Sequence, residues 1–468
     1  MRGIEGALHV LEQIRASREG PFASAGGRGA ASCRPAGTSA SFASEALRKL
    51  GGEMSPGDLT LASSLVYAVL RRQEMWRAVY GKFLRDSRGD ASLPPLIRDC
   101  LLVGTAGLLE LRHFAGGVLV NGLLDHLKSH SQKRWVPLVN AVLHNVGERG
   151  VARVEALRRS PAAEERALWA GIPVWSLPAW TRTWQRADLN RLFDLLPQPP
   201  LSALRPAPGK RDELLEALRE RGMEAEPSPL SEAVHLSSTV LPTDVPGFER
   251  GLATLQTEGS ILAASLGARL YREGLILDLC SGRGVKGGQV LQMCPEARLE
   301  GWELSEGRHR SALREMKRLG VEGRAALRQG SALELEPSEP PSLVLLDAPC
   351  SGSGTWCRKP ESKWRLNWER FDRLAAAQRS LLERAVALCA PRGIILYITC
   401  SLLRQENESV VAEVLAGHPE CAELPAPWEN GQGSDGVKPF RRGRPWGTYI
   451  WPETPWLDGF YCAVIIKR

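Results

Sequence analysis

The stretch LVLLDAPC (residues 343–350) decides the fold class, because an apolar run of strand length ends in a short turn that contains proline. The stretch IILYITCS (residues 394–401) repeats this pattern. Uninterrupted apolar runs are typical of strands that are buried on both faces of a parallel sheet. In open α/β sheets, ligands bind beyond the carboxyl ends of the strands. Cys350 and Cys400 are therefore predicted to point into the same crevice.

From about Thr239 onward, apolar strand candidates alternate with helical segments, which indicates a parallel sheet. A crossover helix is predicted over residues 370–388, where the apolar residues fall on one helical face. We expect residues 241–468 to form one α/β domain. The strand candidates are residues 275–279, 297–302, 343–346, 394–399 and 461–466.

The part of the chain before this domain shows a different pattern. Residues 1–150 carry apolar residues at helical spacing and are predicted to form an all-helical domain, in which residues 21–44, rich in Gly, Ala and Ser, form a loop. Residues 165–240 are expected to form a small α+β domain. Four tryptophans between residues 162 and 185 are predicted to pack between helices. The chain as a whole is therefore predicted to be a multidomain protein with an all-α, a small α+β and an α/β part.

The composition is that of a globular protein, with 468 residues, 43% hydrophobic and 24% charged. A net charge of +7 is compatible with nucleic-acid binding, although an unrelated basic enzyme fits the charge equally well. The ten cysteines form no CxxC pair, so zinc and thioredoxin-type redox sites are not supported. Because no signal peptide and no apolar run of membrane-spanning length is found, we expect a cytoplasmic protein with free thiols, no metal and no membrane contact.

The segment DLCSGRGVK (residues 278–286) follows a predicted strand and precedes a predicted helix. Glycines let a ligand approach the backbone closely, and a helix N-terminus favours anionic groups. At the end of the next strand stands Glu303, an acid that can accept hydrogen bonds from both ribose hydroxyls of a nucleoside cofactor. The spacing differs from GxGxxG, which favours S-adenosyl-L-methionine over a nicotinamide dinucleotide.

Two thiols beside one acid suit the methylation of cytosine at carbon 5. That carbon is not nucleophilic until a thiolate adds to carbon 6, and the reaction also needs an acid at ring nitrogen 3 and a base for the carbon 5 proton. Asp347 is placed to hydrogen-bond the base edge. From the residues alone, Cys350 and Cys400 are both candidates for the nucleophile. The alternative for each is a buried structural cysteine.

Several motifs together resemble one known family. DAPCSGSGTWCRKPESKWR (347–365), YITCSLLRQENESVV (397–411), WELSEGRHRSALREMKRLGV (302–321) and DGFYCAVIIKR (458–468) are similar to segments of the bacterial RsmB/Sun family of ribosomal RNA cytosine-5 methyltransferases. VNAVL (139–143) lies in a helical region that resembles the NusB-like domain of this family. The resemblance covers nearly the whole chain and is most specific in its last half. It implies a NusB-like RNA-binding domain over 1–150, a small RNA-recognition-like domain over 165–240 and a Rossmann-like class I methyltransferase domain over 241–468.

The resemblance also implies roles for individual residues. Cys400 would be the attacking thiol, Cys350 would help to eliminate the enzyme adduct, and Asp347 would serve both base and cofactor. Glu303 would hold the ribose. The remaining residues implied to bind S-adenosyl-L-methionine are Cys280, Ser281, Gly282, Arg283, Gly284, Val285, Lys286 and Ser331.

Three positions depart from the family pattern. The loop usually reads CAAPGGK, whereas this chain has CSGRGVK, so that Arg283 replaces a proline. Ser331 stands where an aspartate is usual, which predicts weaker cofactor binding by about 1 kcal/mol, the net contribution of one hydrogen bond. Cys357 stands where the family usually has a basic residue.

The implied partner is RNA, with small-subunit ribosomal RNA as the target and the protein acting as a monomer. Transfer RNA or DNA is an alternative target, although DNA cytosine-5 enzymes lack a Thr-Cys-Ser partner such as Cys400. A non-catalytic RNA-binding assembly factor is a second alternative. Phosphate contacts are expected from basic residues near the motifs, namely Arg358, Lys359, Lys363, Arg365, Arg441, Arg442 and Arg444.

Overall fold

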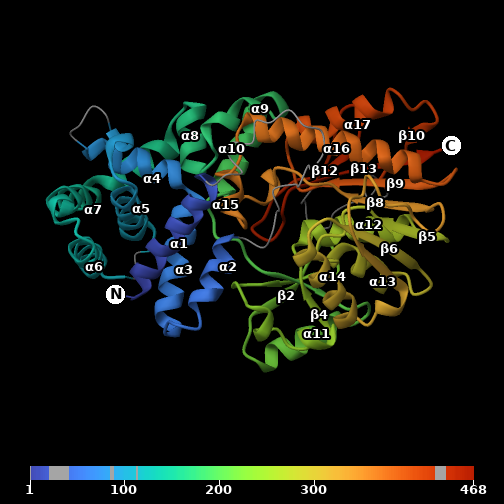
Figure 1. Cartoon of the computed structure of the whole chain (residues 1–468), viewed down its shortest axis with the longest axis horizontal. Helices are drawn as coiled ribbons and strands as arrows, with labels where there is room; N and C mark the ends of the chain where they lie inside the picture. Colours follow the sequence, from blue (N-terminus) through green and yellow to red (C-terminus); the bar gives the residue numbers. More distant parts are fainter. Residues whose placement is uncertain (1, 20–41, 85–88, 112–113, 427–438) are drawn as a thin grey trace. The chain divides into compact units, whose positions relative to one another are not determined.

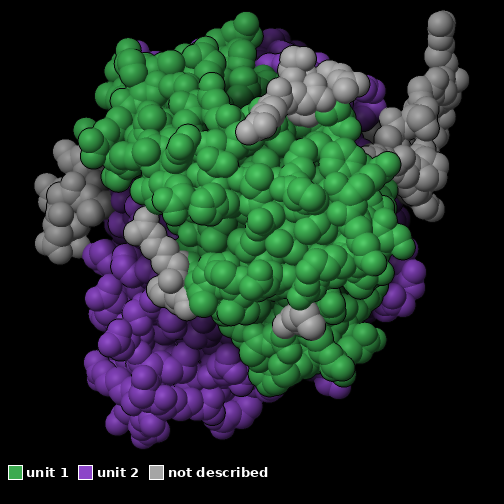
Figure 2. Space-filling model, turned by 90° about the vertical axis from the view of Figure 1, so that its left-hand side faces the viewer, with its two compact units in different colours: residues 1–33, 38–197, 359–365 green, residues 34–37, 198–358, 366–468 purple. Residues whose placement is uncertain are grey.

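The computed structural model describes residues 2–19, 42–84, 89–111, 114–426 and 439–468 (Figure 1). The chain forms two compact units, which Figure 2 distinguishes by colour. The first contains the described residues up to 197 together with residues 359–365, and the second contains residues 198–358 and 366–468. Most of the loop expected over residues 21–44 lies outside the described part of the chain.

The described part of the first unit is helical, as the sequence predicted. Helix α3 begins at a cap that the sequence encodes, because Ser55 Oγ accepts a hydrogen bond from the Asp58 amide at 3.2 Å. Helix α5 is buried. Its Gly104 faces Leu143 of helix α7, and a Cβ atom at this glycine would lie 2.6 Å from the Leu143 side chain. The absence of that atom lets α5 and α7 approach closely. The helices are α1 (Arg2–Glu19), α2 (Phe42–Leu50), α3 (Pro56–Arg71), α4 (Gln73–Tyr80), α5 (Pro95–Glu110), α6 (Gly116–Ser129), α7 (Val136–Arg159), α8 (Ala163–Ala170), α9 (Leu177–Thr183), α10 (Arg186–Leu195) and the short α15 (Pro360–Lys363).

The helical unit thus continues through α10 to Leu195, beyond the end expected near residue 150. Residues 163–195 form three short helices, and Trp169 and Trp180 among them are buried, as helix packing requires. The small sheet comes later. Its strands are β1 (Ala203–Pro206), β2 (Ala225–Pro227), β3 (Val234–Leu236) and β4 (Ala253–Leu255), in the antiparallel order β2-β3-β1-β4, with helix α11 (Arg211–Glu220) packed on it. The α+β character is confirmed, and the strands occupy residues 203–255.

The large sheet of the second unit has nine strands in the order β11-β12-β13-β9-β8-β5-β6-β7, with β10 paired to β13. Strands β5 to β9 are parallel, and β13 adds to β9 in the antiparallel direction. The strands are β5 (Leu275–Asp278), β6 (Arg298–Glu303), β7 (Ala325–Gln329), β8 (Leu343–Asp347), β9 (Ile394–Thr399), β10 (Cys421–Glu423), β11 (Phe440–Arg442), β12 (Thr448–Ile450) and β13 (Phe460–Lys467). The order reverses between β5 and β8, so the carboxyl ends of these two strands flank the switch point where α/β proteins bind ligands.

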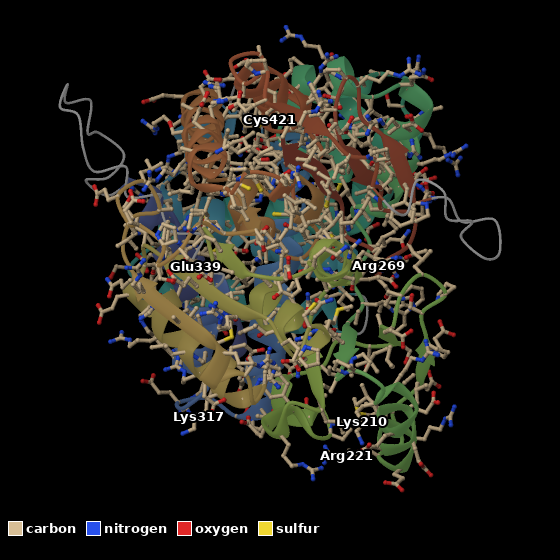
Figure 3. All side chains as sticks on the ribbon, turned by 90° about the vertical axis from the view of Figure 1, so that its right-hand side faces the viewer. Lys210, Arg221, Arg269, Lys317, Glu339 and Cys421 are labelled. Atoms are coloured by element: carbon tan, nitrogen blue, oxygen red, sulfur yellow. The ribbon has the colours of Figure 1, made fainter. Side chains whose placement is uncertain are left out.

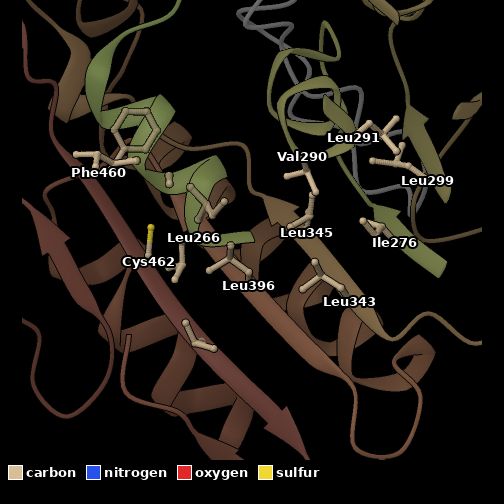
Figure 4. Packing of buried hydrophobic residues seen from close by; sticks show 14 of the residues in the cluster. Leu266, Ile276, Val290, Leu291, Leu299, Leu343, Leu345, Leu396, Phe460 and Cys462 are labelled. Atoms are coloured by element: carbon tan, nitrogen blue, oxygen red, sulfur yellow. The ribbon is translucent and has the colours of Figure 1, made fainter. Parts of the chain in front are cut away.

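Helices cover this sheet on both faces. On β8, Leu343 and Leu345 belong to a buried cluster with Leu266 and Val290 (Figure 4), while Val344 and Leu346, which point the other way, are also buried. This two-sided burial explains the continuous apolar runs and holds the strand ends in place. The helices of this part are α12 (Glu258–Leu270), α13 (Val285–Met293), α14 (Glu306–Arg318), α16 (Trp368–Leu388) and α17 (Glu408–Leu415).

All five strands expected from the sequence are present, with ends that differ by no more than a residue. Strand β7 was not expected, because it pairs with β6 alone and its side chains are half-buried or exposed, so it carries no apolar run. None of the described helices combines the length and the apolar character that a membrane crossing requires.

Candidate active site

Cys350 and Cys400 meet at the carboxyl ends of two neighbouring strands. Strands β8 and β9 run parallel, with Asp347 opposite Ile398, and each chain then turns and presents its cysteine. The two Sγ atoms are 3.3 Å apart, and neither cysteine forms a disulfide. The structure therefore brings together two residues that are 50 positions apart in the sequence.

The two thiols differ in their surroundings. Cys350 is buried, whereas Cys400 is partly exposed. The hydrogen bond to Cys400, followed by burial, raises the pKa of Cys350 well above its ordinary value. The contact geometry allows either sulfur to be the donor, and the raised pKa of Cys350 favours Cys350 as the donor and Cys400 Sγ as the acceptor. A sulfur that accepts a hydrogen bond is favoured in its thiolate form.

Lys286 and Asp347 form an ion pair beside the thiols. Lys286 Nζ lies 2.6 Å from Asp347 Oδ2, and it also lies over the ring of Phe460, 5.3 Å from the centroid. Burial alone would lower the pKa of Lys286, but the Asp347 carboxylate and the negative charge of Cys400 raise it above its ordinary value. Lys286 is therefore held as an ammonium ion that stabilises negative charge on both Asp347 and Cys400.

The glycine-containing loop between β5 and α13 is held against the neighbouring strand. Ser281 donates to the carbonyl oxygen of Trp302 through its amide at 2.9 Å and through its hydroxyl at 3.2 Å. Gly284 has φ +79° and begins α13, and its Cβ position lies 3.0 Å from Met316, so a side chain is excluded on both grounds. Arg283 is exposed, while Cys280, Gly282 and Val285 are half-buried.

Asp278 is a site residue that the sequence analysis did not single out. It ends β5, it is buried, and its Oδ1 has no hydrogen-bond partner within the described part of the chain. Burial, followed by repulsion from Asp347, raises its pKa from 3.8 to about 7. The detectable signal was an acid at the end of a buried strand immediately before the glycine-containing loop.

The ends of β6 and β7 supply two more predicted residues. Glu303 is buried, and its Oε1 accepts hydrogen bonds from the Ser305 amide and from Arg308, each at 2.6 Å. Arg308 is a partner that the sequence did not reveal. Ser331 Oγ accepts a hydrogen bond from the Leu333 amide at 3.2 Å, so this serine stabilises its own turn. The Gly330 amide bonds to the Glu303 carbonyl oxygen at 3.1 Å, which links the ends of the two strands.

Comparison with known proteins identifies the family. Residues 269–466 match the family described as 16S rRNA methyltransferase RsmB/F, and residues 35–148 match the NusB family. A protein named ribosomal RNA small subunit methyltransferase B from Pseudomonas syringae is 30% identical over 425 residues, which cover 88% of this chain and 89% of the relative. The chain belongs to the RsmB/F methyltransferase family. A protein of the same name from Xanthomonas campestris is 25% identical over 446 residues and covers 91% and 93% of the two chains.

Two crystal structures show the same fold. The structure of PH0851 has a TM-score of 0.73 at 20% identity and covers 99% of this chain and 98% of that chain. A methyltransferase homologue from Pyrococcus horikoshii has a TM-score of 0.54 at 22% identity, covering 66% of this chain and 100% of that chain. The predicted fold class, with a NusB-like helical part and a Rossmann-like methyltransferase part, is confirmed. This member of the RsmB/F family is an RNA methyltransferase.

Two of the basic residues expected to contact phosphate have other functions in this RsmB/F protein. Arg358 Nε lies 2.5 Å from Asp458 Oδ1, and its other nitrogens donate to three carbonyl oxygens, those of Leu201 (2.8 Å), Pro455 (3.1 Å) and Trp456 (3.1 Å). Lys363 is buried and donates to the Arg71 carbonyl oxygen at 2.6 Å within the first unit. For these two side chains the expectation was wrong, because burial places their donors on protein oxygens.

The other expected phosphate contacts are more accessible. Lys359 and Arg444 are exposed, Arg365 is half-buried, and Arg441 and Arg442 bond to Glu453 and Glu423. Further cationic side chains project elsewhere from the second unit, and Figure 3 shows Lys210, Arg221, Arg269 and Lys317 among them. Positive charge is therefore spread over several exposed positions and does not by itself locate the RNA.

The described part of the first unit contains a cavity of about 140 Å³. Arg15 and Asp99 both line this cavity, and their side chains form an ion pair at 3.2 Å. One of the arginines that line the cavity is therefore already paired with a carboxylate. The lining residues are Leu11, Ile14, Arg15, Val69, Leu70, Gln73, Arg77, Arg98, Asp99 and Leu102. Among the described residues, no group of three or more His, Cys, Asp or Glu side chains is arranged to hold a metal ion.

Proposed function

We propose that this protein methylates carbon 5 of a cytosine in RNA, with S-adenosyl-L-methionine as the methyl donor. The observation that carries the proposal is the pair of sulfur atoms 3.3 Å apart, beside the Lys286–Asp347 ion pair. A reaction in which one thiol attacks a base and a second assists release needs two such groups at one point.

The residues around the ends of β5, β6 and β7 fit a nucleoside cofactor. The buried Asp278 Oδ1 has no partner among the described residues, and a positive-φ glycine lies at the start of α13. We assign the cofactor to the loop of residues 280–286, to Glu303 through the ribose, to Ser331 through the adenine, and to Asp347 and Asp278. When bound, this cofactor supplies an electrophilic methyl group on sulfur.

We assign the attack to Cys400. Its sulfur accepts the hydrogen bond of Cys350 and is close enough to Lys286 to raise the pKa of that ammonium group, so the thiolate is stabilised from two sides. The thiolate adds to carbon 6 of cytosine, and nitrogen 3 takes up a proton from solvent, so that it can donate a hydrogen bond to the Asp347 carboxylate. Electron density then moves to carbon 5, which becomes nucleophilic and forms the new carbon–carbon bond to the methyl group as the bond from that methyl group to the donor sulfur breaks.

The final step restores the aromatic base. The proton on carbon 5 and the one on nitrogen 3 pass to solvent water, the electron pair of the carbon 5–hydrogen bond forms the carbon 5–carbon 6 double bond, and the bond from carbon 6 to Cys400 Sγ breaks, so that Cys400 leaves as a thiolate. We assign assistance in this step to Cys350, because its sulfur lies within 3.3 Å of the leaving sulfur. The product is 5-methylcytosine with Cys400 regenerated.

We further infer that the substrate is 16S ribosomal RNA, because the relatives that match most of this chain bear the name ribosomal RNA small subunit methyltransferase B. The target base has to be unstacked before it can reach the thiols, which favours a loop or a single strand. We assign RNA binding to the helical first unit and to the small sheet of residues 203–255, and catalysis to the large sheet of the second unit.

Methyl transfer from labelled S-adenosyl-L-methionine to unmodified 16S ribosomal RNA tests the proposal. Wild type should label cytosine, Cys400→Ala should not, and Cys350→Ala should accumulate a protein–RNA adduct that survives denaturant. Transfer RNA and DNA serve as comparison substrates. If only transfer RNA is labelled, transfer RNA and not 16S ribosomal RNA is the substrate. A wild-type protein that neither labels RNA nor binds the cofactor would contradict the proposed chemistry and favour a binding protein.

A further inference from the structure

Glu406 is a buried carboxylate that the proposed reaction does not use. It lies in the loop between β9 and α17, and its side chain is 0% exposed. Oε1 accepts hydrogen bonds from the Ser351 amide at 2.7 Å and from Gln378 Nε2 at 3.1 Å, and Oε2 accepts one from Ser351 Oγ at 2.5 Å. Both carboxylate oxygens are thus bonded inside the protein.

These hydrogen bonds lead to the residues on either side of Cys350. Ser351 follows Cys350 directly. Gln378, on α16, uses the same amide group to donate to the Pro349 carbonyl oxygen at 2.8 Å, and Pro349 precedes Cys350. Glu406 therefore holds one neighbour of Cys350 directly and the other through Gln378.

Ser401, which follows Cys400, also donates a hydrogen bond to Glu406, but the Cys400 turn has further anchors that do not involve this carboxylate. Its carbonyl oxygen accepts a hydrogen bond from the Gly354 amide at 2.9 Å. Thr399 Oγ1 bonds to Asn407 Oδ1 at 2.6 Å, and Asn407 Nδ2 donates to the Ser401 carbonyl oxygen at 2.9 Å. Removal of the Glu406 carboxylate would therefore loosen the Cys350 turn more than the Cys400 turn.

Keeping a carboxylate in this place is energetically unfavourable. Burial raises the pKa of Glu406, and the hydrogen bonds from Ser351, Ser401 and Gln378 only partly oppose this. An apolar side chain would avoid the desolvation cost of the charge. A geometric requirement at the neighbouring thiols accounts for the presence of the carboxylate.

We propose that Glu406 is a positioning residue which, through Ser351 and Gln378, holds Cys350 against Cys400 for the release of the methylated base. This inference rests on the proposed function. Gln378 belongs to the same hydrogen-bond network, because its amide group donates to both Glu406 and the Pro349 carbonyl oxygen. Neither residue hydrogen-bonds a thiol, so both act on the reaction only through the geometry of the turn.

The test compares Glu406→Gln with Glu258→Gln. The Gln side chain is isosteric, but its NH₂ group cannot accept the hydrogen bonds that the carboxylate accepts. Glu258, the first residue of α12, is a matched control, because it is also 0% exposed and accepts hydrogen bonds from Ser228, Ser231 and His235, none of which is next to Cys350 or Cys400 in the chain. A general loss of packing would affect both variants alike.

In a single turnover with 16S ribosomal RNA, Glu406→Gln should transfer the methyl group yet release the product about ten-fold more slowly, the scale expected when buried donors lose an acceptor. A denaturant-resistant adduct should accumulate, as with Cys350→Ala. Glu258→Gln should release at the wild-type rate. Gln378→Ala should slow release in the same direction. Release at the wild-type rate in Glu406→Gln, or an equal delay in Glu258→Gln, would overturn the proposal.

A measurement without RNA separates this inference from the proposed function. Phenylarsine oxide condenses with two neighbouring thiols, forming two sulfur–arsenic bonds while the two thiol protons leave with the arsenic-bound oxygen as water. Cys400→Ser gives the background from the other cysteines. Glu406→Gln should bind the arsenical about ten-fold more weakly than Glu258→Gln. Equal binding would overturn the positioning role. A wild-type protein inert toward RNA that still shows this difference would refute only the cytosine chemistry.

Discussion

Replacing Arg358 by methionine distinguishes a structural role from the phosphate contact that its sequence position indicated. Methionine keeps much of the length of the side chain but removes the charge and every donor. The guanidinium pairs with Asp458, which is 2% exposed, and donates to three backbone carbonyl oxygens. Burial alone would lower the pKa of Arg358, but Asp458 raises it above its ordinary value. The arginine therefore stays charged at every accessible pH.

The expected decrease in stability follows from what the substitution leaves behind. Arg358→Met leaves the Asp458 carboxylate buried without its cation, and breaking a buried pair in this way costs about 3–5 kcal/mol. Adding Asp458→Asn removes the unpaired charge and should recover about half of the decrease, on the order of 2 kcal/mol. Non-additivity of this size is the signature of direct interaction.

Urea unfolding followed by circular dichroism measures the effect. A chain with two compact units is expected to unfold in more than one transition, so each midpoint is compared separately. With a urea dependence of about 3 kcal/mol per molar, the decrease should move one midpoint down by about 1–1.7 M. Lys359→Met, at the exposed neighbouring position, is the control and should stay within about 0.5 kcal/mol of wild type.

The salt dependence of RNA binding tests the alternative, in which Arg358 contacts a phosphate of the RNA. If the Arg358 guanidinium neutralised a phosphate, Arg358→Met would weaken RNA binding and reduce the salt slope by about 0.7–0.9. An Arg358→Met variant with that change and an unaltered urea midpoint would refute the structural role. We expect the reverse at Arg358, and we expect Lys359→Met to be the variant that changes the salt slope.

Three further outcomes are expected. The raised pKa of Asp278 means that the folded state retains this proton, so the stabilisation is present below pH 4 and is lost as the pH rises through 7. The free energy of unfolding of Asp278→Asn should therefore rise by about 3 kcal/mol relative to wild type between pH 5 and pH 8 in urea unfolding, and a constant difference would contradict this. Lys286→Met should shift alkylation of Cys400 by iodoacetamide to higher pH, because the thiolate loses a nearby ammonium; an unchanged profile would argue against that role. In Gly354→Ala the new Cβ would lie 2.1 Å from the Gly459 carbonyl oxygen, so the free energy of unfolding should fall by about 2 kcal/mol in thermal unfolding. Gly323→Ala, where the new Cβ would point into open space, is the control and should change this free energy little.

Much of the fold could be read from the sequence. The apolar runs that end at Asp347 and at Thr399 are strands β8 and β9, and the sulfurs of Cys350 and Cys400, which were predicted to point into one crevice, lie 3.3 Å apart. This worked because burial on both faces of a parallel sheet imposes a continuous apolar run, and because parallel neighbours end at the same edge. Strand β7 escaped notice because an edge strand carries no such run.

Only the tertiary structure decided which polar groups are partners. Arg358 and Asp458 are 100 positions apart, Glu406 and Ser351 are 55 apart, and Lys286 and Asp347 are 61 apart. Local sequence patterns report hydrophobic periodicity and turn chemistry, which depend on near neighbours. A hydrogen bond between distant residues depends on strand order and on the path of each turn, and a surface arginine and a buried one look alike in the sequence. The sequence alone therefore determined the buried strands and the cysteines that follow them, whereas the fold decided which charged side chains are exposed and which are held inside the protein.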